Sequence, residues 1–146
     1  MLDRKNLRIR ISNNLPEDAR IIREAVFQIE QGFTDEFDAI DEDVNTIHMV
    51  IYNEGKPIGT CRHFKENDAY RIGRLAVVKE YRGQGIGEYI VLCAEKEIFK
   101  RGGQEVVLSA QVRARGFYEK IGYRAEGDIY MDEDCPHIGM RKVLEG

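Results

Sequence analysis

A glycine-rich turn constrains the fold of this chain most. Residues 82–87 read RGQGIG and lie between an apolar, strand-like run, residues 72–78, and an amphipathic pattern that continues to about Arg101. Alternate glycines leave no Cβ atom between the backbone and a ligand, and they permit a positive φ where the chain turns. The turn leads into a helix N-terminus, whose free N–H groups and dipole attract an anion. The pattern therefore predicts a strand–turn–helix unit that binds phosphate or pyrophosphate through its backbone.

Two familiar phosphate-binding motifs do not fit this turn. A P-loop carries Lys and then Ser or Thr after its last glycine, and no such pair follows Gly87. The dinucleotide fingerprint G-x-G-x-x-G opens the first strand–helix unit of a repeated βαβ array. Here the spacing is G-x-G-x-G, past the middle of a 146-residue chain. A glycine turn that caps a helix without any ligand stays open at this point.

The turn resembles the [QR]-x-x-G-x-[GA] signature of the GCN5-related N-acetyltransferases (the GNAT superfamily), which holds the pyrophosphate of acetyl-CoA. A second phrase of that family is similar to residues 106–123, which read VVLSAQVRARGFYEKIGY. The chain departs at Gln111, where the family usually has Asn; Gln keeps a donor and an acceptor but reaches one methylene further. The positions that match are Ala114, Phe117, Tyr118, Lys120, Gly122 and Tyr123.

A finer resemblance concerns one branch of the superfamily. Residues 26–31, VFQIEQ, and residues 130–140, YMDEDCPHIGM, are similar to the ElaA/YjcF-like branch. Together the matches reach from about residue 20 to residue 141. That branch has no settled acceptor, so the resemblance indicates the acetyl donor and leaves the acceptor open.

The order of elements predicts an α+β fold. Apolar alternation indicates a strand at 7–11, and helical spacing indicates a helix from about Pro16 to Glu30. Strands 70–78 and 105–110 flank the long helix and should therefore run parallel. We expect a single N-acetyltransferase domain, residues 1–146, with a mixed, mostly antiparallel sheet flanked by helices. The resemblance adds that the parallel pair splays apart to hold the cofactor. Further strands are predicted at 46–52, 57–64, 123–130 and 137–143, and further helices at 85–101 and 116–120.

Composition limits the class of protein and its partners. A chain with 42% hydrophobic and 33% charged residues is typical of a soluble globular protein. It has no apolar run near the ~20 residues that span a bilayer, and its first residues lack a signal-peptide pattern. Three scattered cysteines then indicate reduced thiols and a cytoplasmic location. The net charge of −4, without a basic cluster, argues against a nucleic-acid partner. We expect no membrane partner, and a homodimer stays open.

The resemblance implies a set of residues that bind acetyl-CoA. In the family the pantetheine enters a gap beside the fourth strand and pairs with its backbone, which here is Leu75, Ala76 and Val77. The glycine turn holds the pyrophosphate, and residues at the end of the fifth strand and on the short helix complete the site. The turn contributes Arg82, Gly83, Gln84, Gly85, Ile86 and Gly87, and the later segment contributes Gln111, Ala114 and Phe117.

The resemblance also implies how the acetyl group moves. Tyr118 occupies the position at which the family places a general acid for the departing sulfur. A phenol with a pKa of about 10 stays protonated until a thiolate with a pKa of about 8.5 appears. We therefore expect direct transfer of an acetyl group from acetyl-CoA to a primary amine, with Tyr118 as the general acid.

The base that deprotonates the amine is less clearly indicated. Many relatives carry a glutamate on the fourth strand, but this strand offers Arg74 and no acid. Candidates for the acceptor site are Glu30, His63 and His137. Deprotonation through water is an equal alternative, so the base stays open.

An acidic cluster bears on the acceptor. Six acids fall within nine positions: Asp35, Glu36, Asp38, Asp41, Glu42 and Asp43. Such blocks are usually solvated loops, but an acidic rim could also concentrate a cationic amine near the cofactor. We expect the acceptor to be a small, cationic amine.

Two other functions remain as alternatives. Cys61-x-His63 and Cys135-x-His137 could supply four zinc ligands if their strands met, although structural zinc sites usually show other spacings. We expect no metal. The alternatives are a non-catalytic acyl-CoA-binding or metal-binding module, and an acetyltransferase that acts on protein N-termini or lysines.

Overall fold

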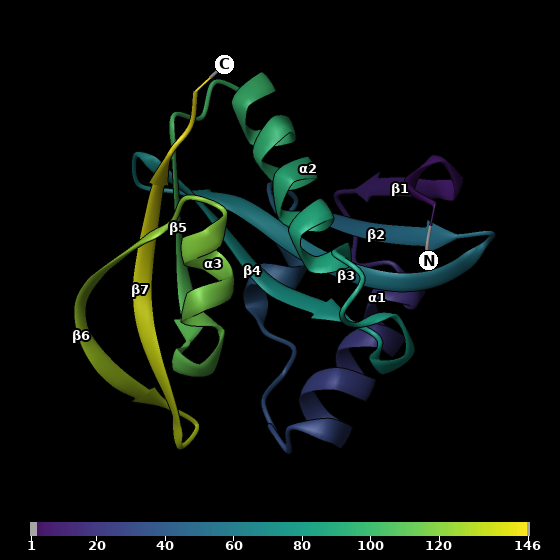
Figure 1. Ribbon diagram of the computed structural model, residues 1–146, viewed down its shortest axis with the longest axis horizontal. Coiled ribbons are helices and arrows are strands. Elements are labelled where there is room, and N and C mark those ends of the chain that lie inside the picture. The colour runs from purple at the N-terminus through teal and green to yellow at the C-terminus, as the bar shows by residue number, and fades with distance from the viewer. Residues whose placement is uncertain (1–2, 146) are drawn as a thin grey trace.

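A seven-stranded mixed sheet forms the centre of the computed structural model, which describes residues 3–145 (Figure 1). The strand order across the sheet is β1-β2-β3-β4-β5-β7-β6. The strands are β1 (Leu7–Ser12), β2 (Ile47–Asn53), β3 (Lys56–Glu66), β4 (Ala69–Val77), β5 (Glu105–Gln111), β6 (Arg124–Asp132) and β7 (Cys135–Val143). The α-helices are α1 (Glu17–Arg23), α2 (Ile86–Lys100) and α3 (Arg115–Lys120), and η2 (Glu24–Glu30) is a π-helix. Short 3₁₀ helices are η1 (Arg4–Asn6), η3 (Ala39–Glu42), η4 (Lys79–Tyr81) and η5 (Val112–Ala114).

The pairing of the strands confirms the predicted α+β fold. Strands β1 to β4 pair antiparallel in succession, and β5, β7 and β6 also pair antiparallel. The strand pair β4–β5, which flanks α2 in the sequence, is parallel. The sheet is therefore mixed and mostly antiparallel, with one parallel pair at its centre.

The parallel pair separates soon after it begins. Only Tyr70 with Val106 and Arg71 with Val107 are in register between β4 and β5. Between β3 and β4 the register passes from Arg62–Gly73 to Thr60–Ala76, so β4 carries one extra residue there. Arg74 lies in this bulge with a φ of +50°. A bulge bends its strand and ends regular pairing, and this confirms the predicted splay.

Helices cover both faces of the sheet and bury a separate apolar cluster on each. On one face α2 packs Ile90, Ala94 and Ile98 against β3 and β4. On the other face α1 and η2 pack Ile22 and Val26 against Val50 of β2. Within residues 3–145 no helix is long and apolar enough to cross a membrane.

The first long helix differs from its predicted form. Residues 17–23 are α-helical, but residues 24–30 form a π-helix, with i→i+5 bonds that hold more residues in each turn. The wider turn rotates later side chains relative to an α-helix. Ile29, three residues beyond the buried Val26, is 81% exposed.

The structure places His63 in the core and not at an acceptor site. The side chain is fully buried, and neither ring nitrogen has a hydrogen-bond partner in the described chain. His63 shares the α2 face of β3 with Cys61, because residues two apart on a strand point the same way. Burial lowers the pKa of His63 to about 4. The prediction that this histidine contributes to the acceptor site is therefore wrong.

Replacing His63 with Phe should make the free energy of unfolding less dependent on pH. The unfolded histidine titrates near 6.5, and the folded pKa is about 4. Stability is thus fully present above pH 6.5 and is lost as pH falls toward 4. Between pH 7.5 and pH 5 this group should cost the wild type roughly 2 kcal/mol, which His63→Phe should not lose.

Urea unfolding at the two pH values measures this difference. His48, whose pKa burial also lowers, contributes in the same direction to both proteins and cancels in the comparison. Equal pH dependence in wild type and variant would contradict a sealed, neutral His63.

Candidate functional site

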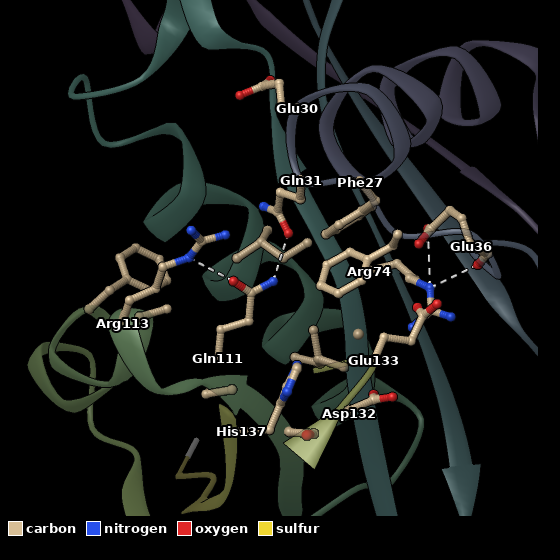
Figure 2. A pocket seen from close by; sticks show the side chains of 18 of the residues that line it. Phe27, Glu30, Gln31, Glu36, Arg74, Gln111, Arg113, Asp132, Glu133 and His137 are labelled. Atoms are coloured by element: carbon tan, nitrogen blue, oxygen red, sulfur yellow. Dashed lines mark hydrogen bonds and ion pairs between the residues drawn. The ribbon is translucent and has the colours of Figure 1, made fainter. Parts of the chain in front are cut away.

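A cavity of about 760 Å³ opens where β4 and β5 separate. Gly73, Arg74 and Leu75 line it from β4, and the end of β5 lines it from the other side. The π-helix η2 and the β6–β7 turn enclose it further (Figure 2). Of the residues predicted from sequence, the cavity brings together Glu30, Leu75, Arg82, Gln111, Ala114, Phe117, Tyr118 and His137.

The glycine turn lies beside this cavity and caps α2. Gly83 and Gly85 have φ values of +77° and +81°, and Gly85 is the residue before the first turn of α2. It has no side chain to occupy the N–H groups that open the helix. A Cβ atom on Gly87 would lie 3.3 Å from the Phe117 ring, so glycine permits α2 and α3 to approach here. The turn therefore leaves the first N–H groups of α2 open to an anion, and its role as a pyrophosphate site stays a prediction.

Other members of the predicted cofactor set do not line the cavity with their side chains. The side chain of Ala76 is buried toward α1, and that of Ile86 is buried in the core below α2. Of residues 82–87, only Arg82 lines the cavity itself. Contacts from Ala76 and Ile86 to a ligand in the cavity would have to come from their main-chain groups.

Arg82 ties the turn to two neighbouring elements. Its Nη1 and Nη2 atoms each lie 2.8 Å from a carboxylate oxygen of Glu30, and its Nε donates to the Val77 carbonyl at 2.9 Å. The bonds from Arg82 hold the pKa of Glu30 below its ordinary value. Glu30 is thus an ionised partner of Arg82 and a poor proton acceptor.

Tyr118 faces the cavity from α3. Its ring meets Phe117 and Tyr123 edge-on, with ring centroids 4.9 Å and 5.7 Å away. Burial raises the pKa of the Tyr118 phenol, and the nearby Cys61 adds to this effect. The phenol is therefore protonated at neutral pH and can serve as a proton donor.

Three side chains linked by hydrogen bonds cross the cavity near the end of β5. Gln111 donates from Nε2 to Oε1 of Gln31 at 2.8 Å and accepts from Nε of Arg113 at 2.7 Å (Figure 2). Sequence reasoning did not single out Gln31 or Arg113. Gln31 does lie in the branch-like segment 26–31, so that resemblance was the available signal.

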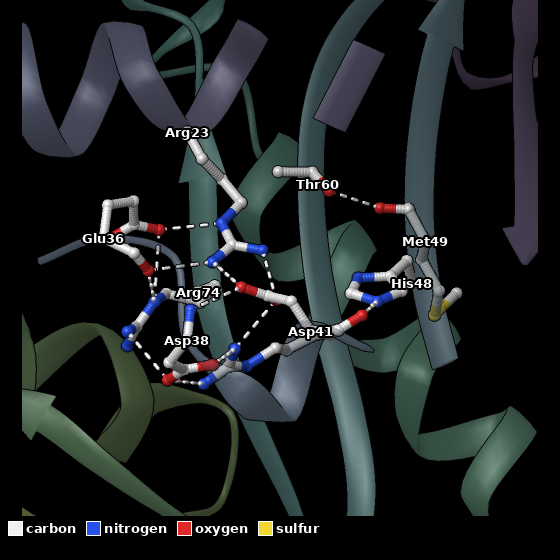
Figure 3. A network of polar contacts seen from close by, with 9 residues as sticks. Arg23, Glu36, Asp38, Asp41, His48, Met49, Thr60 and Arg74 are labelled. Atoms are coloured by element: carbon white, nitrogen blue, oxygen red, sulfur yellow. Dashed lines mark hydrogen bonds and ion pairs between the residues drawn. The ribbon is translucent and has the colours of Figure 1, made fainter. Parts of the chain in front are cut away.

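A buried ion-pair network stands behind the β4 bulge (Figure 3). Arg23, only 1% exposed, places Nε 2.7 Å from Glu36 and Nη1 2.7 Å from Asp41. Arg62 contacts Asp41 at 2.8 Å. Burial disfavours the charge of Asp41, but its bonds to Arg23 and Arg62 outweigh this and hold its pKa well below the usual range.

The network continues to the cavity wall. Arg62 also contacts Asp38 at 2.7 Å, and Arg74 contacts Glu36 at 3.1 Å and Asp38 at 3.4 Å. Three arginines thus meet three carboxylates, and the formal charges cancel. The side chain of Arg74, which the bulge projects into the cavity wall, is held by this neutral cluster.

The acidic cluster at 35–43 is therefore not a uniform acidic rim. Glu36 and Asp41 are buried, and Asp38 is paired with two arginines. Asp35 lines the cavity, but Glu42 and Asp43 do not. Other acids on its wall are Asp132, at the end of β6, and Glu133, in the β6–β7 turn. The prediction that this loop as a whole attracts a cation is wrong, because arginines neutralise half of it.

The rival zinc site is not formed. Cys61 lies in the core on β3, whereas Cys135 lies on β7, and β4 and β5 separate these strands in the sheet. Among residues 3–145, no group of three or more His, Cys, Asp or Glu side chains is placed to hold a metal ion.

Comparisons with known proteins agree with this geometry. A family model described as an acetyltransferase (GNAT) domain matches residues 19–144. YjcF of Bacillus subtilis, named as an N-acetyltransferase, is 34% identical over 128 residues, which cover 86% of this chain and 91% of that one. A crystal structure assigned as an N-acetyltransferase from Lactobacillus plantarum is 32% identical, covers 95% of this chain and 99% of its own, and has a TM-score of 0.88. Escherichia coli ElaA, at 22% identity, shares the fold with a TM-score of 0.83 over 93% of this chain and 99% of its own.

Removing one carboxylate from the buried network should destabilise the protein strongly. In Asp41→Asn, the buried guanidinium groups of Arg23 and Arg62 lose a carboxylate charge that compensates their own. Breaking a buried pair typically costs about 3–5 kcal/mol, and we expect a loss in the free energy of unfolding near the lower end. Urea denaturation monitored by circular dichroism measures it. The exposed neighbour provides the control: Glu42→Gln should change stability by about 0.5 kcal/mol or less. Similar small effects for both variants would contradict a structural role for the network.

Proposed function

The chain belongs to the GNAT family of acetyltransferases and is an acetyl-CoA-dependent N-acetyltransferase, and we propose that it acetylates the primary amine of a small molecule by direct transfer. The proposal treats residues 1–146 as one acetyltransferase domain. The observation that carries it is the placement of Tyr118 in a cavity that opens at the β4–β5 split and borders the glycine turn.

The proposed cofactor site follows the free edge of β4. Beyond Arg71 this strand has no register partner in β5, so the backbone of Leu75, Ala76 and Val77 can pair with the amides of pantetheine. The pyrophosphate would bind the main-chain N–H groups of residues 83–87, at the positive end of the α2 dipole. Gln111, Ala114 and Phe117 would form the opposite wall.

The proposed chemistry uses Tyr118 after the amine has attacked. The neutral amine forms a bond to the thioester carbonyl carbon, and the carbon–sulfur bond then breaks. The departing thiolate takes the phenolic proton of Tyr118, and the phenolate is reprotonated by the proton that leaves the new amide nitrogen. The raised pKa of Tyr118 keeps the phenol protonated until the thiolate departs, and the proton that the amide nitrogen returns to the phenolate completes the transfer.

The charges on the cavity wall support a cationic acceptor. Asp35, Asp132 and Glu133 line the cavity and make no ion pair in the described part of the chain. Of the arginines on the same wall, Arg74 is paired with Glu36 and Arg82 with Glu30, whereas Arg113 donates to Gln111. An ammonium group would therefore meet net negative potential at this end of the cavity. We propose that these three acids, and not the buried network, favour an amine that carries positive charge.

Adding a methyl group at Gly85 should weaken binding of acetyl-CoA at least tenfold. The Cβ atom would lie 3.3 Å from Nη2 of Arg4 beside the proposed pyrophosphate site, and the left-handed backbone would shift toward values that alanine tolerates. Gly102→Ala is the matched control, because Gly102 has a φ of +89° with nothing within 4 Å of its Cβ position and lies beyond the far end of α2. Isothermal titration with acetyl-CoA measures both. Equal affinity in a folded Gly85→Ala protein would refute the assignment of the turn.

Tyr118→Phe should lower kcat by about 10²- to 10³-fold and leave the affinity for acetyl-CoA nearly unchanged. The variant keeps the ring and its edge-on contacts but removes the proton that the sulfur needs. Thiol release from acetyl-CoA across a panel of small amines measures the rate. Tyr70→Phe, at the closed end of the β4–β5 pair, is the control and should keep wild-type turnover. Wild-type kcat in Tyr118→Phe at saturating substrates would show that water or another group protonates the thiolate.

A further inference from the structure

His137 is held on the cavity wall by a contact that sets its tautomer. The residue lies on β7, opposite Gln111 of β5, and is 9% exposed (Figure 2). Its Nδ1 atom is 2.8 Å from the carbonyl oxygen of Cys135. A carbonyl oxygen can only accept, so Nδ1 must carry the hydrogen. In the neutral ring Nε2 is therefore the unprotonated nitrogen.

The second nitrogen remains available. Within the described chain the His137 ring makes one hydrogen bond, through Nδ1, and none through Nε2. The buried side-chain atoms without a partner within residues 3–145 belong to Arg62 and His63, so His137 Nε2 is not sealed from solvent. Because the residue lines the cavity, a lone pair on Nε2 can meet a molecule bound there.

Neighbouring side chains fix the plane of the ring. Tyr130 of β6 stacks on His137, with centroids 6.0 Å apart and an angle of 26° between the planes. The Tyr130 hydroxyl is in turn hydrogen-bonded to Ser109 of β5. The ring is thus held between a backbone carbonyl and an aromatic face, an arrangement that keeps a proton acceptor in one orientation.

The other ionisable side chains on the described cavity wall are carboxylates, arginines and a tyrosine. Glu30 is occupied by Arg82, and Glu36 is occupied by Arg23 and Arg74. Asp35 precedes η3, Asp132 ends β6 and Glu133 begins the β6–β7 turn. Arg113 lies on η5, and Tyr118 faces the cavity from α3. The imidazole of His137 is thus the one nitrogen base on the described part of the cavity wall.

We propose that His137 is the general base that deprotonates the acceptor amine, which rests on the proposed function of the same cavity. The ammonium form of the acceptor gives one proton to Nε2, and the nitrogen lone pair so freed attacks the thioester carbonyl. The imidazolium is stabilised by the Cys135 carbonyl through Nδ1–H and later loses its proton to solvent. Tyr118 gives its proton to the thiolate, which leaves as the thiol, and a second proton from the acceptor nitrogen restores the Tyr118 phenol. One acetyl group moves, and one proton is released per turnover.

Two variants test the role of His137 in the intact protein. His137→Phe keeps a ring that can stack on Tyr130 but has no proton acceptor, and His137→Gln keeps polarity without basicity. At pH 7, with an amine that the wild type acetylates, kcat should fall at least 10²-fold in both. Affinity for acetyl-CoA, measured by calorimetry, should stay within about twofold. Circular dichroism and melting curves establish that each variant is folded.

The pH profile separates a base from a merely structural residue. As the pH rises toward the pKa of the amine, more of the acceptor binds already deprotonated. The ratio of wild-type kcat to variant kcat should therefore shrink by tenfold or more for both variants. Added imidazole should restore part of the rate to His137→Phe at pH 7.

Three outcomes would overturn the proposal. Wild-type kcat in both variants would assign the base to water or another group and leave the proposed function intact. A deficit that is the same at every pH, without rescue by imidazole, would give His137 a positioning role only. Failure of the wild type to acetylate any amine in the panel would remove both the base and the proposed function, which distinguishes it from the first two results.

Discussion

The site depends on the loss of pairing between β4 and β5. A central strand normally satisfies its N–H and C=O groups on both sides, yet β4 keeps only two register partners in β5. The bulge at Arg74 inserts one residue and turns the rest of β4 away. A strand edge in the middle of a sheet is thereby left to a ligand, and the glycine turn that follows β4 leads directly to the N-terminus of α2. One change in strand direction produces both the cavity and access to the helix dipole.

A neutral ion-pair network supports this distorted strand. Arg74 adopts a φ of +50°, which is uncommon for a residue with a side chain, and its guanidinium contacts Glu36 and Asp38. Those acids belong to the same cluster as Arg23 and Arg62, which are buried. Complete pairing makes burial of these charges tolerable. Because the network joins α1, the 36–41 segment, β3 and the bulge, it couples the first helical segment to the wall of the site.

Local patterns predicted much of this structure, and long-range contacts account for what they missed. The glycine turn, the parallel strands around α2, and Tyr118 beside the cavity follow from short motifs and from the rule that strand–helix–strand units are parallel. The pairing of Asp41 with Arg23 and Arg62 joins residues 18 and 21 positions apart, which periodicity does not reveal. No feature of the sequence around His63 distinguishes a histidine sealed in the core from one in a site. The π-helix at 24–30 turns its side chains to other directions than the α-helix that the sequence predicted.

A crystal structure of the protein with coenzyme A tests the central claim most directly. The pantetheine should lie in the gap between β4 and β5, with its amides paired to the backbone of residues 75–77. The pyrophosphate should contact the N–H groups of residues 83–87, and the sulfur should lie within hydrogen-bonding distance of the Tyr118 hydroxyl. A coenzyme bound elsewhere, or a β4–β5 pair that closes along its whole length, would contradict the account.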